Sequence, residues 1–311
     1  MKPWCFVHVT DIHYGSPRSF RYRPSHIENW ETACGQIIGL KPDLLLATGD
    51  LAHDGWIHPH ELERIRANLG DLPFPCHGIA GNMDVGNKVA HSAGLDDDMA
   101  HNIRSDLLKT FASTFGPYNW SFVHKNVRFT GFCDMLVGSG LPEEQQLWHW
   151  LESLKRQPRS RFHVCLMHYP LFVDALEEPT FDNCDRKQYL NWYDGLDKAE
   201  RLRIFDMLKA LDVSLVFSGH VHHNRTRYAD GIRFETCTGT AFKKETNLRP
   251  DSNTEFGFIC CKVSEGGLEP TFVPLERIST AEGYGPRGHL PERDYSLAWE
   301  QPSYGSEAEK D

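Results

Sequence analysis

Residues 4–13 read WCFVHVTDIH, and this stretch introduces a pattern that recurs along the chain. Its first part, Trp4–Thr10, is apolar or β-branched at nearly every position and predicts a buried strand. Asp11 and His13 follow directly, and carboxylate and imidazole groups both bind metal ions. The stretch therefore predicts a strand whose carboxyl end presents two candidate metal ligands.

The same pattern occurs four more times. Gly49-Asp50, Gly81-Asn82, Met167-His168 and Gly219-His220-Val221-His222 each stand at the end of a predicted strand. Ligands of open α/β sheets gather beyond the carboxyl ends of the strands, so we expect all five loops to meet at one rim. Alone, D-x-H is common at helix starts and GD and GN are common in turns, and a lone His168 could be a hydrogen-bonded core residue. The two imidazoles of Gly219-His220-Val221-His222 have little structural purpose. Their combination and order predict a metal site.

Helical patterns alternate with the strands, which is typical of an α/β domain. The first strands are predicted at Trp4–Thr10, Asp43–Thr48, Pro75–Ala80, Val127–Asp134, Arg161–Met167 and Val213–Ser218, and the helices at 25–39, 59–69, 99–115, 142–157 and 198–211. Ile232–Cys237, Glu255–Val263 and Pro270–Leu275 have no helix between them and predict a terminal antiparallel meander. We expect one domain over residues 1–275 and a tail or lid over residues 276–311, where Gly, Pro and charged residues dominate.

The connection 170–196 is too long for a plain turn and predicts a functional flap. It carries three aromatic residues close together, Tyr189, Trp192 and Tyr193. These side chains either stack on a base or sugar of the substrate or form a hydrophobic plug for the flap.

Composition excludes several classes of protein. The 311 residues carry a formal net charge of −10 and 40% hydrophobic residues, as in an ordinary globular protein. No apolar run approaches the roughly 18 residues of a membrane span, and no signal peptide is evident, so we expect a cytoplasmic protein that does not bind membranes. Nine scattered cysteines predict reduced thiols. The acidic balance makes long nucleic acid an unlikely partner.

The candidate ligands comprise two carboxylates, four imidazoles and one amide. They are Asp11, Asp50, His13, His168, His220, His222 and Asn82. Mixed nitrogen and oxygen donors suit Mn, Fe, Zn or Co better than Ca or Mg. If one carboxylate bridges, seven ligands make eight bonds, four to each of two divalent or trivalent ions. Such an ion pair serves as a clamp in phosphoryl transfer.

The order D-x-H, GD, GN, H, GHxH over residues 4–223 resembles the calcineurin-like metallophosphoesterase superfamily. The resemblance implies an α/β fold of two packed mixed β-sheets flanked by helices, the αββα sandwich. It also implies that Asp11, His13 and His222 hold one metal ion, that Asn82, His168 and His220 hold the other, and that Asp50 bridges them. GDLAHDG at residues 49–55 resembles the cyclic-nucleotide phosphodiesterase branch, and the calcineurin-like phosphoesterase domain proteins are a second similar group.

One position departs from the family pattern. Most members read GNH followed by Asp or Glu, and that His binds a phosphate oxygen or protonates the leaving group, whereas this chain reads Gly81-Asn82-Met83-Asp84. Methionine cannot donate a proton, and members without the His resemble a subgroup that favours phosphodiesters. Three histidines in neighbouring loops are candidate substitute proton donors: His53, His91 and His223. The alternative for each is a solvated or capping loop residue. Asp84 would normally orient the missing His. Without it, Asp84 is expected to hydrogen-bond to the backbone or to a metal-bound water.

We therefore expect a phosphoric ester hydrolase that uses a hydroxide bridging two metal ions. Catalytic roles are predicted for Asp50, Asn82, Asp84 and His223, and substrate contacts for Asn82, His223, Arg225 and Tyr14. The expected substrate is a small, nucleotide-like phosphodiester. Three alternatives stay open: a phosphomonoesterase or protein Ser/Thr phosphatase, a hydrolase of nucleotide-linked pyrophosphate, and an inactive metal-binding scaffold.

Overall fold

A computed structural model gives the structure of residues 2–17, 19, 22–243 and 251–282. Its strands are β1 (Trp4–Val9), β2 (Leu45–Ala47), β3 (Cys76–Gly78), β4 (Trp120–His124), β5 (Val127–Gly131), β6 (Phe162–Leu166), β7 (Leu215–Ser218), β8 (Arg225–Ala229), β9 (Ile232–Thr236), β10 (Gly257–Val263) and β11 (Leu268–Pro274). Its α-helices are α1 (Pro24–Leu40), α2 (Pro59–Gly70), α3 (Asn82–Val85), α4 (Ser105–Phe115), α5 (Pro142–Leu154), α6 (Tyr189–Asp194) and α7 (Lys198–Ala210). Short 3₁₀ helices cover Asp98–His101 and Asp134–Leu136.

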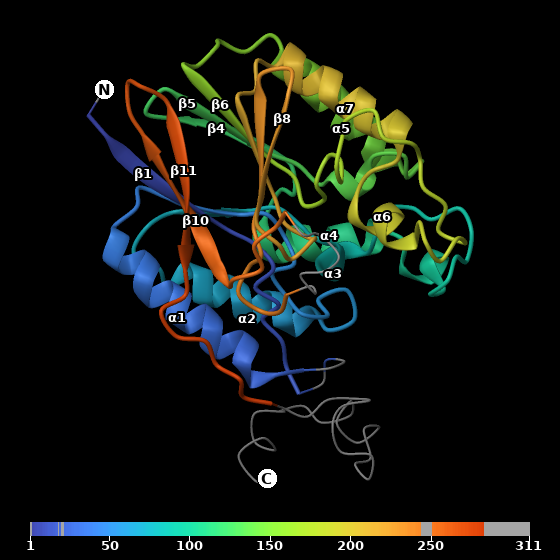
Figure 1. The fold of residues 1–311 in the computed structure, drawn as a ribbon, viewed down its shortest axis with the longest axis horizontal. Helices are drawn as coiled ribbons and strands as arrows, with labels where there is room; N and C mark the ends of the chain where they lie inside the picture. The colour runs from blue at the N-terminus through green and yellow to red at the C-terminus, as the bar shows by residue number, and fades with distance from the viewer. Residues whose placement is uncertain (1, 18, 20–21, 244–250, 283–311) are drawn as a thin grey trace.

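Two β-sheets form the centre of the molecule. One has the strand order β11-β10-β1-β2-β3 and the other β4-β5-β6-β7-β9-β8. Figure 1 shows α1 and α2 outside the first sheet and α5 and α7 outside the second. This arrangement is the αββα sandwich that the family resemblance implies.

Alternation along β1 accounts for the layers. Phe6 points between the sheets, where its ring lies 5.1 Å from that of Phe129 in β5 and 6.0 Å from that of Phe217 in β7. Val7 and Val9 point to the opposite side of the strand and join the core that includes Trp30 of α1. Successive strand residues face opposite sides of a sheet, so one apolar strand can bury both of its faces.

Parallel pairing brings the functional ends of the strands together. β1, β2 and β3 are mutually parallel, as are β5, β6, β7 and β9 in the second sheet. Their carboxyl ends carry the loops that the sequence singles out. The antiparallel strands β4, β8, β10 and β11 lie at or toward the edges of the sheets.

The predicted terminal meander is wrong in its pairing. β9 pairs in parallel with β7 in the second sheet, whereas β10 and β11 form an antiparallel hairpin on β1 in the first. β4 and β8 are absent from the prediction because both lie at sheet edges, contain polar residues and form no apolar run. The helix predicted over 99–115 is split into the 3₁₀ turn Asp98–His101 and α4.

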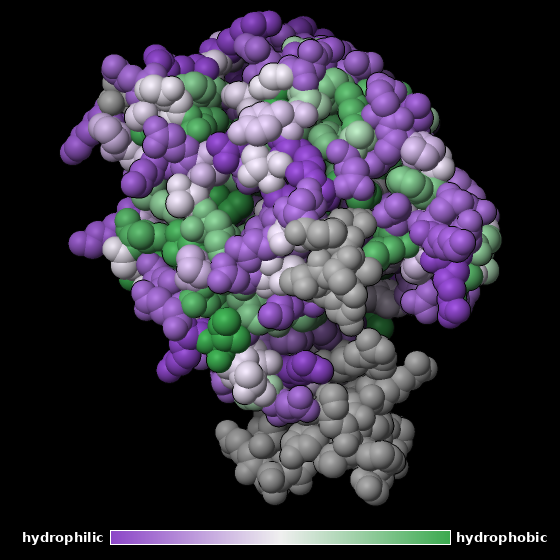
Figure 2. Space-filling model, in the orientation of Figure 1, coloured by the Kyte–Doolittle hydropathy of each residue, from purple (hydrophilic) through white to green (hydrophobic). Residues whose placement is uncertain are grey.

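The chain after β11 runs along α1 as far as it is described. Ser279 N–H donates to Asn29 Oδ1 at 2.7 Å, and Ser25 N–H donates to the Ala281 carbonyl at 3.2 Å. Most of the predicted tail, residues 283–311, lies outside the described residues. No helix in the described part of the chain has the length and apolar character needed to span a bilayer. On the face in Figure 2, hydrophilic residues predominate, and smaller hydrophobic groups lie between them.

Candidate metal centre

Seven predicted ligands meet at the carboxyl ends of strands from both sheets. They come from the loops after β1 (Asp11, His13), β2 (Asp50), β3 (Asn82), β6 (His168) and β7 (His220, His222). Each of these residues is at most 5% exposed. Residues far apart in sequence thus form one buried polar cluster at the rim that the strand pattern predicts.

The first group of donors comprises Asp11, His13 and His222, whose donor atoms lie within 4.8 Å of one another. His222 Nε2 lies 3.4 Å from Asp11 Oδ1. His13 Nε2 lies 3.8 Å from the same oxygen and 3.6 Å from Asp50 Oδ2. These four side chains could surround one metal ion.

The second group comprises Asp50, His168 and His220, with the amide oxygen of Asn82 between the rings. His168 Nε2 lies 3.3 Å from Asp50 Oδ1 and 2.8 Å from Asn82 Oδ1. His220 Nδ1 lies 2.9 Å from Asn82 Oδ1. Asp50 therefore presents one carboxylate oxygen to each group, as a bridging ligand would.

Backbone carbonyls fix three of the imidazole rings. The pairs are His168 Nδ1 with Thr48 O at 2.7 Å, His220 Nε2 with Tyr193 O at 2.8 Å, and His222 Nδ1 with Phe242 O at 2.8 Å. A carbonyl oxygen only accepts, so these nitrogens carry the hydrogen, and in a neutral ring the other nitrogen keeps a lone pair. Each lone pair then faces Asp or Asn oxygens. A nitrogen lone pair and a facing oxygen repel each other unless a cation lies between them. The donor set therefore fits two metal ions.

His13 supports the same conclusion. Its ring is 1% exposed, and neither ring nitrogen has a hydrogen-bond partner among the described residues. An unpaired buried imidazole costs free energy. A metal ion beside Nε2 would satisfy the ring.

The backbone at the cluster is unusual. Five of the seven candidate ligands have left-handed φ angles between 47° and 66°, namely Asp11, His13, Asp50, His220 and His222. Non-glycine residues rarely adopt this conformation, and it concentrates at functional sites. Gly81 allows the close approach of two loops, because a Cβ there would lie 2.1 Å from the Asp50 nitrogen.

Electrostatics favour a positive charge beside Asp50. Burial alone would raise the pKa of this carboxyl, but the attraction of His168 outweighs it and lowers the pKa below its usual range. Burial would likewise lower the pKa of His168, but the negative charge of Asp50 raises it to about 10. The pocket thus stabilises either a proton or a metal cation at this position.

Two further buried carboxylates hold the loops. Asp84 accepts the N–H groups of Gly81 at 2.8 Å and Ala52 at 3.0 Å, and burial together with the charge of Asp50 raises its pKa to about 7. Asp134 accepts the N–H groups of His168 at 2.7 Å and Tyr169 at 2.9 Å. The sequence interpretation missed Asp134 as a site residue, although its place at the end of a predicted strand was a usable signal.

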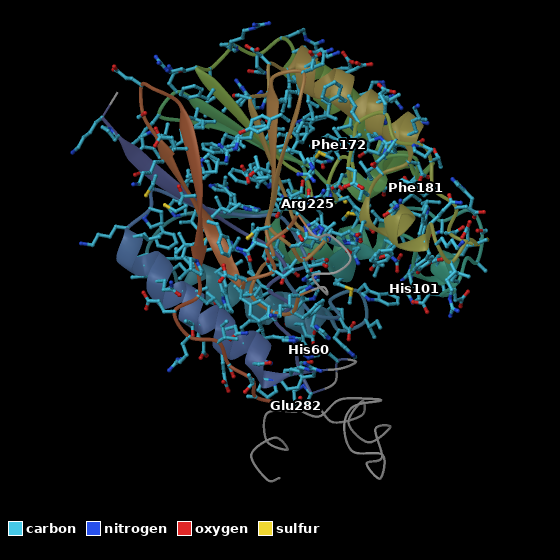
Figure 3. The ribbon with its side chains drawn as sticks, in the orientation of Figure 1. His60, His101, Phe172, Phe181, Arg225 and Glu282 are labelled. Carbon is cyan, nitrogen blue, oxygen red and sulfur yellow. The ribbon has the colours of Figure 1, made fainter. Side chains whose placement is uncertain are left out.

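Of the predicted substrate-binding residues, Asn82 belongs to the second group, whereas Arg225 and Tyr14 lie outside both groups. Arg225 donates to the Val173 carbonyl at 2.8 Å and pairs with Asp174 at 2.8 Å and Asp251 at 3.0 Å. Figure 3 shows it near Phe172, in the segment that follows His168. The guanidinium carbon of Arg64 lies over the Tyr14 ring, 5.2 Å from the ring centre.

The three candidate proton donors are dispersed. His223 lines a small apolar cavity with Phe172 and Phe234. His53 is buried, and its ring lies 5.5 Å from that of His13. His91 is exposed. Of the three, His53 packs its ring against that of a candidate ligand, His13.

Phe242 is a neighbour of the cluster that no sequence pattern revealed. Its ring lies 4.4 Å from that of His13 and stacks at 4.2 Å on that of His222. The side chain is 37% exposed although both imidazoles beneath it are buried. It therefore forms part of the rim around the first group.

Glu61 of α2 ties two site loops together and gives a test of the structure. Its side chain accepts hydrogen bonds from the Ser19 hydroxyl and, at 2.9 Å, from Asp54 N–H. Burial raises its pKa from 4.5 to about 8. Between these values the folded chain keeps a proton that the unfolded chain has lost. The free energy of unfolding should therefore fall as pH rises through this window, by up to about 1.4 kcal/mol per pH unit from this group.

Glu61→Gln should remove this contribution, so the variant should lose less stability than the wild type between pH 5 and pH 8. Urea unfolding at several pH values measures the difference. Glu63→Gln, at an exposed position of the same helix, is the matched control and should follow the wild type. Parallel stability curves for Glu61→Gln and the wild type would show that Glu61 does not hold the extra proton.

Comparisons with known proteins identify the family of this chain. A family model described as calcineurin-like phosphoesterase matches residues 6–224. A Nostoc protein named 3',5'-cyclic-nucleotide phosphodiesterase is 25% identical over 89% of this chain and 93% of its own length. Human serine/threonine-protein phosphatase CPPED1 is 25% identical over 59% of this chain and 54% of its own length. Purple acid phosphatase PPD1 from yellow lupin shares the fold, with a TM-score of 0.60 at 13% identity over 91% of this chain and 53% of that one. Because the family model spans well over half of the sequence, the chain belongs to the calcineurin-like phosphoesterase family.

Proposed function

We propose that this phosphoric ester hydrolase is a phosphodiesterase for small, nucleotide-like substrates, with two metal ions held by the seven clustered side chains. The observation that carries the proposal is the anchoring of His168, His220 and His222 through one ring nitrogen each, which turns the other nitrogens toward Asp and Asn oxygens. We also propose that the protein is cytoplasmic.

The ligand roles follow from the distances. Asp11, His13 and His222 would hold one ion, Asn82, His168 and His220 the other, and Asp50 both. Bound ions would supply positive charge to polarise a phosphoryl group and to activate water near neutral pH. The protein residues contribute fixed orientation, because their loops are bonded to one another before a substrate arrives.

Met83 supports a diesterase. Its N–H donates to Asp50 Oδ1 at 2.7 Å, so residue 83 is held directly beside the bridging candidate. A histidine there could protonate a leaving group, whereas a thioether cannot. Asp84, which would orient that histidine, instead accepts backbone hydrogen bonds. Catalytic roles for Asp84 and His223, and substrate contacts from Arg225 and Tyr14, remain predictions.

The rim supports a substrate with an aromatic group. All seven candidate ligands are buried, while Met83 and Tyr193 are half-buried and Phe242 is exposed. The Tyr193 hydroxyl lies 3.5 Å from Asn82 Nδ2, and its ring lies 4.8 Å from that of His220. Aromatic side chains thus border both groups, where they could stack on a nucleobase.

Activity assays on wild type and Met83→His test the proposal. With added Mn²⁺, the wild type should hydrolyse bis(p-nitrophenyl) phosphate with a higher kcat/KM than p-nitrophenyl phosphate. Met83→His should raise the monoester-to-diester ratio of kcat/KM by about tenfold or more, because an imidazole there can donate to the additional charged phosphate oxygen that the monoester carries and the diester lacks.

Met83→Leu is the matched control, since it keeps an apolar side chain of similar size and should leave the ratio unchanged. A wild type that prefers the monoester would contradict the diesterase assignment. An unchanged ratio in Met83→His would show that residue 83 does not set the preference between the two substrates.

A further inference from the structure

The last turn of α6 meets the second group of donors. Carbonyl groups at the end of a helix lack partners within the helix. The carbonyl of Tyr193 accepts a hydrogen bond from His220 Nε2 at 2.8 Å, and His220 Nδ1 then lies 2.9 Å from Asn82 Oδ1. The position of this turn therefore determines which way the His220 ring faces.

Lys88 holds the turn from outside the flap. Its ammonium group donates to the carbonyls of Trp192 and Gly195, which flank Tyr193 along the chain. It also lies 4.6 Å from the centre of the Trp192 ring and 3.7 Å from Asp197 Oδ1. Lys88 belongs to the segment after α3, which Figure 1 shows on the same side of the molecule as α6.

Lys88 is only 4% exposed, and its burial has a cost. Desolvation lowers the pKa of the ammonium group to about 8, although Asp197 partly opposes this shift. Buried charges are tolerated when they are fully hydrogen-bonded. An apolar side chain of the same length would fill the space without this cost, but it could not bind the carbonyls at the end of α6.

We propose that Lys88 is a positioning residue for the second metal group, because it fixes the turn whose Tyr193 carbonyl orients the His220 ring. Lys88 acts through α6 and contacts none of the seven candidate ligands in the hydrogen bonds and ion pairs described. The inference rests on the metal centre of the proposed function, but not on the identity of the substrate.

Zinc titration of the chelator-treated, full-length chain tests this role without measuring activity. Imidazole ¹⁵N signals of His220 and His222 report Zn²⁺ binding at the two groups separately. In Lys88→Met, half-saturation at His220 should need on the order of 10- to 100-fold more Zn²⁺, the usual effect of losing a residue that orients a ligand. The signal of His222 should titrate as in the wild type.

Two further variants isolate the effect. Lys88→Arg keeps the charge and the donors and should restore part of the affinity at His220. Tyr189→Phe removes a different anchor of α6, the hydrogen bond from the Tyr189 hydroxyl to Asp98 Oδ1 at 2.8 Å, and should leave both signals unchanged. If Lys88→Met does not fold, Lys88→Gln, whose shorter side chain cannot span both carbonyls, takes its place with the same expected loss.

The outcomes are distinct. The proposal is supported if Zn²⁺ binding is weaker at His220 alone, and only in the Lys88 variants. Three results would overturn it. Lys88→Met could bind Zn²⁺ as the wild type does, it could bind Zn²⁺ equally weakly at His220 and His222, or Tyr189→Phe could weaken Zn²⁺ binding as much as Lys88→Met does. A wild-type chain that binds no Zn²⁺ would overturn the metal centre itself together with this inference, whereas normal wild-type binding with failure of the variant test rejects only the role of Lys88.

Discussion

Asp50→Ala should lower kcat/KM for a chromogenic phosphodiester with added Mn²⁺ by on the order of 10³-fold, the largest change expected from one substitution. Asp50 is 2% exposed and presents Oδ2 at 3.6 Å from His13 and Oδ1 at 3.3 Å from His168. Loss of the carboxylate removes an oxygen ligand from both candidate ion positions at once. Metal analysis should accordingly find fewer than two ions per chain in the variant.

Two comparisons sharpen this test. Asp50→Asn can keep an acceptor for the Met83 N–H but lacks the negative charge, so a similar loss of activity would assign the effect to charge. Asp43→Ala changes a carboxylate just before β2, whereas Asp50 follows this strand. It should retain activity, because Asp43 pairs with His124 and Lys125 away from the cluster. Undiminished hydrolysis by Asp50→Ala would refute the bridging assignment.

Asp134→Ala should reduce the free energy of unfolding by about 2 to 4 kcal/mol, because it leaves two buried N–H groups without acceptors. These groups belong to His168 and Tyr169, and the Asp134 side chain is 0% exposed. The same change releases the loop that carries His168. Diesterase activity should therefore fall along with stability, which urea unfolding and initial-rate assays measure on the same preparation.

Asp134→Asn retains one carbonyl oxygen and should lose about half as much stability. Glu152→Ala provides the surface control, because Glu152 is 55% exposed and its pairing with Lys155 contributes little. If Asp134→Ala were as stable as Glu152→Ala, the two backbone hydrogen bonds would contribute nothing to the fold.

Strand endings made much of the site predictable. An apolar run followed by Asp, Asn or His is visible in sequence, and parallel pairing then brings such endings to one rim. Asp11, Asp50 and His168 illustrate this, since each directly follows or nearly follows a predicted strand. The convergence of their loops needed no knowledge of loop conformation.

The supporting contacts could not be predicted in the same way. Thr48 and Tyr193 orient imidazoles through backbone carbonyls, and every residue type has such a group. Phe242 reaches the rim from a segment with no strand or helix pattern around it. β8 was missed because its run of polar residues suits a sheet edge as well as a loop. These features depend on tertiary structure, which short-range patterns do not encode.

The hydrogen bond from His168 to the Thr48 carbonyl crosses from one sheet to the other. The cluster therefore spans the seam of the sandwich, and its ligands take their places only when the two sheets are docked in register. Ion binding and sheet docking are for this reason coupled equilibria, in which each favours the other. A substitution in the interior between the sheets, such as one at Phe6 or Phe217, can thus act at a distance on metal affinity without altering a single ligand.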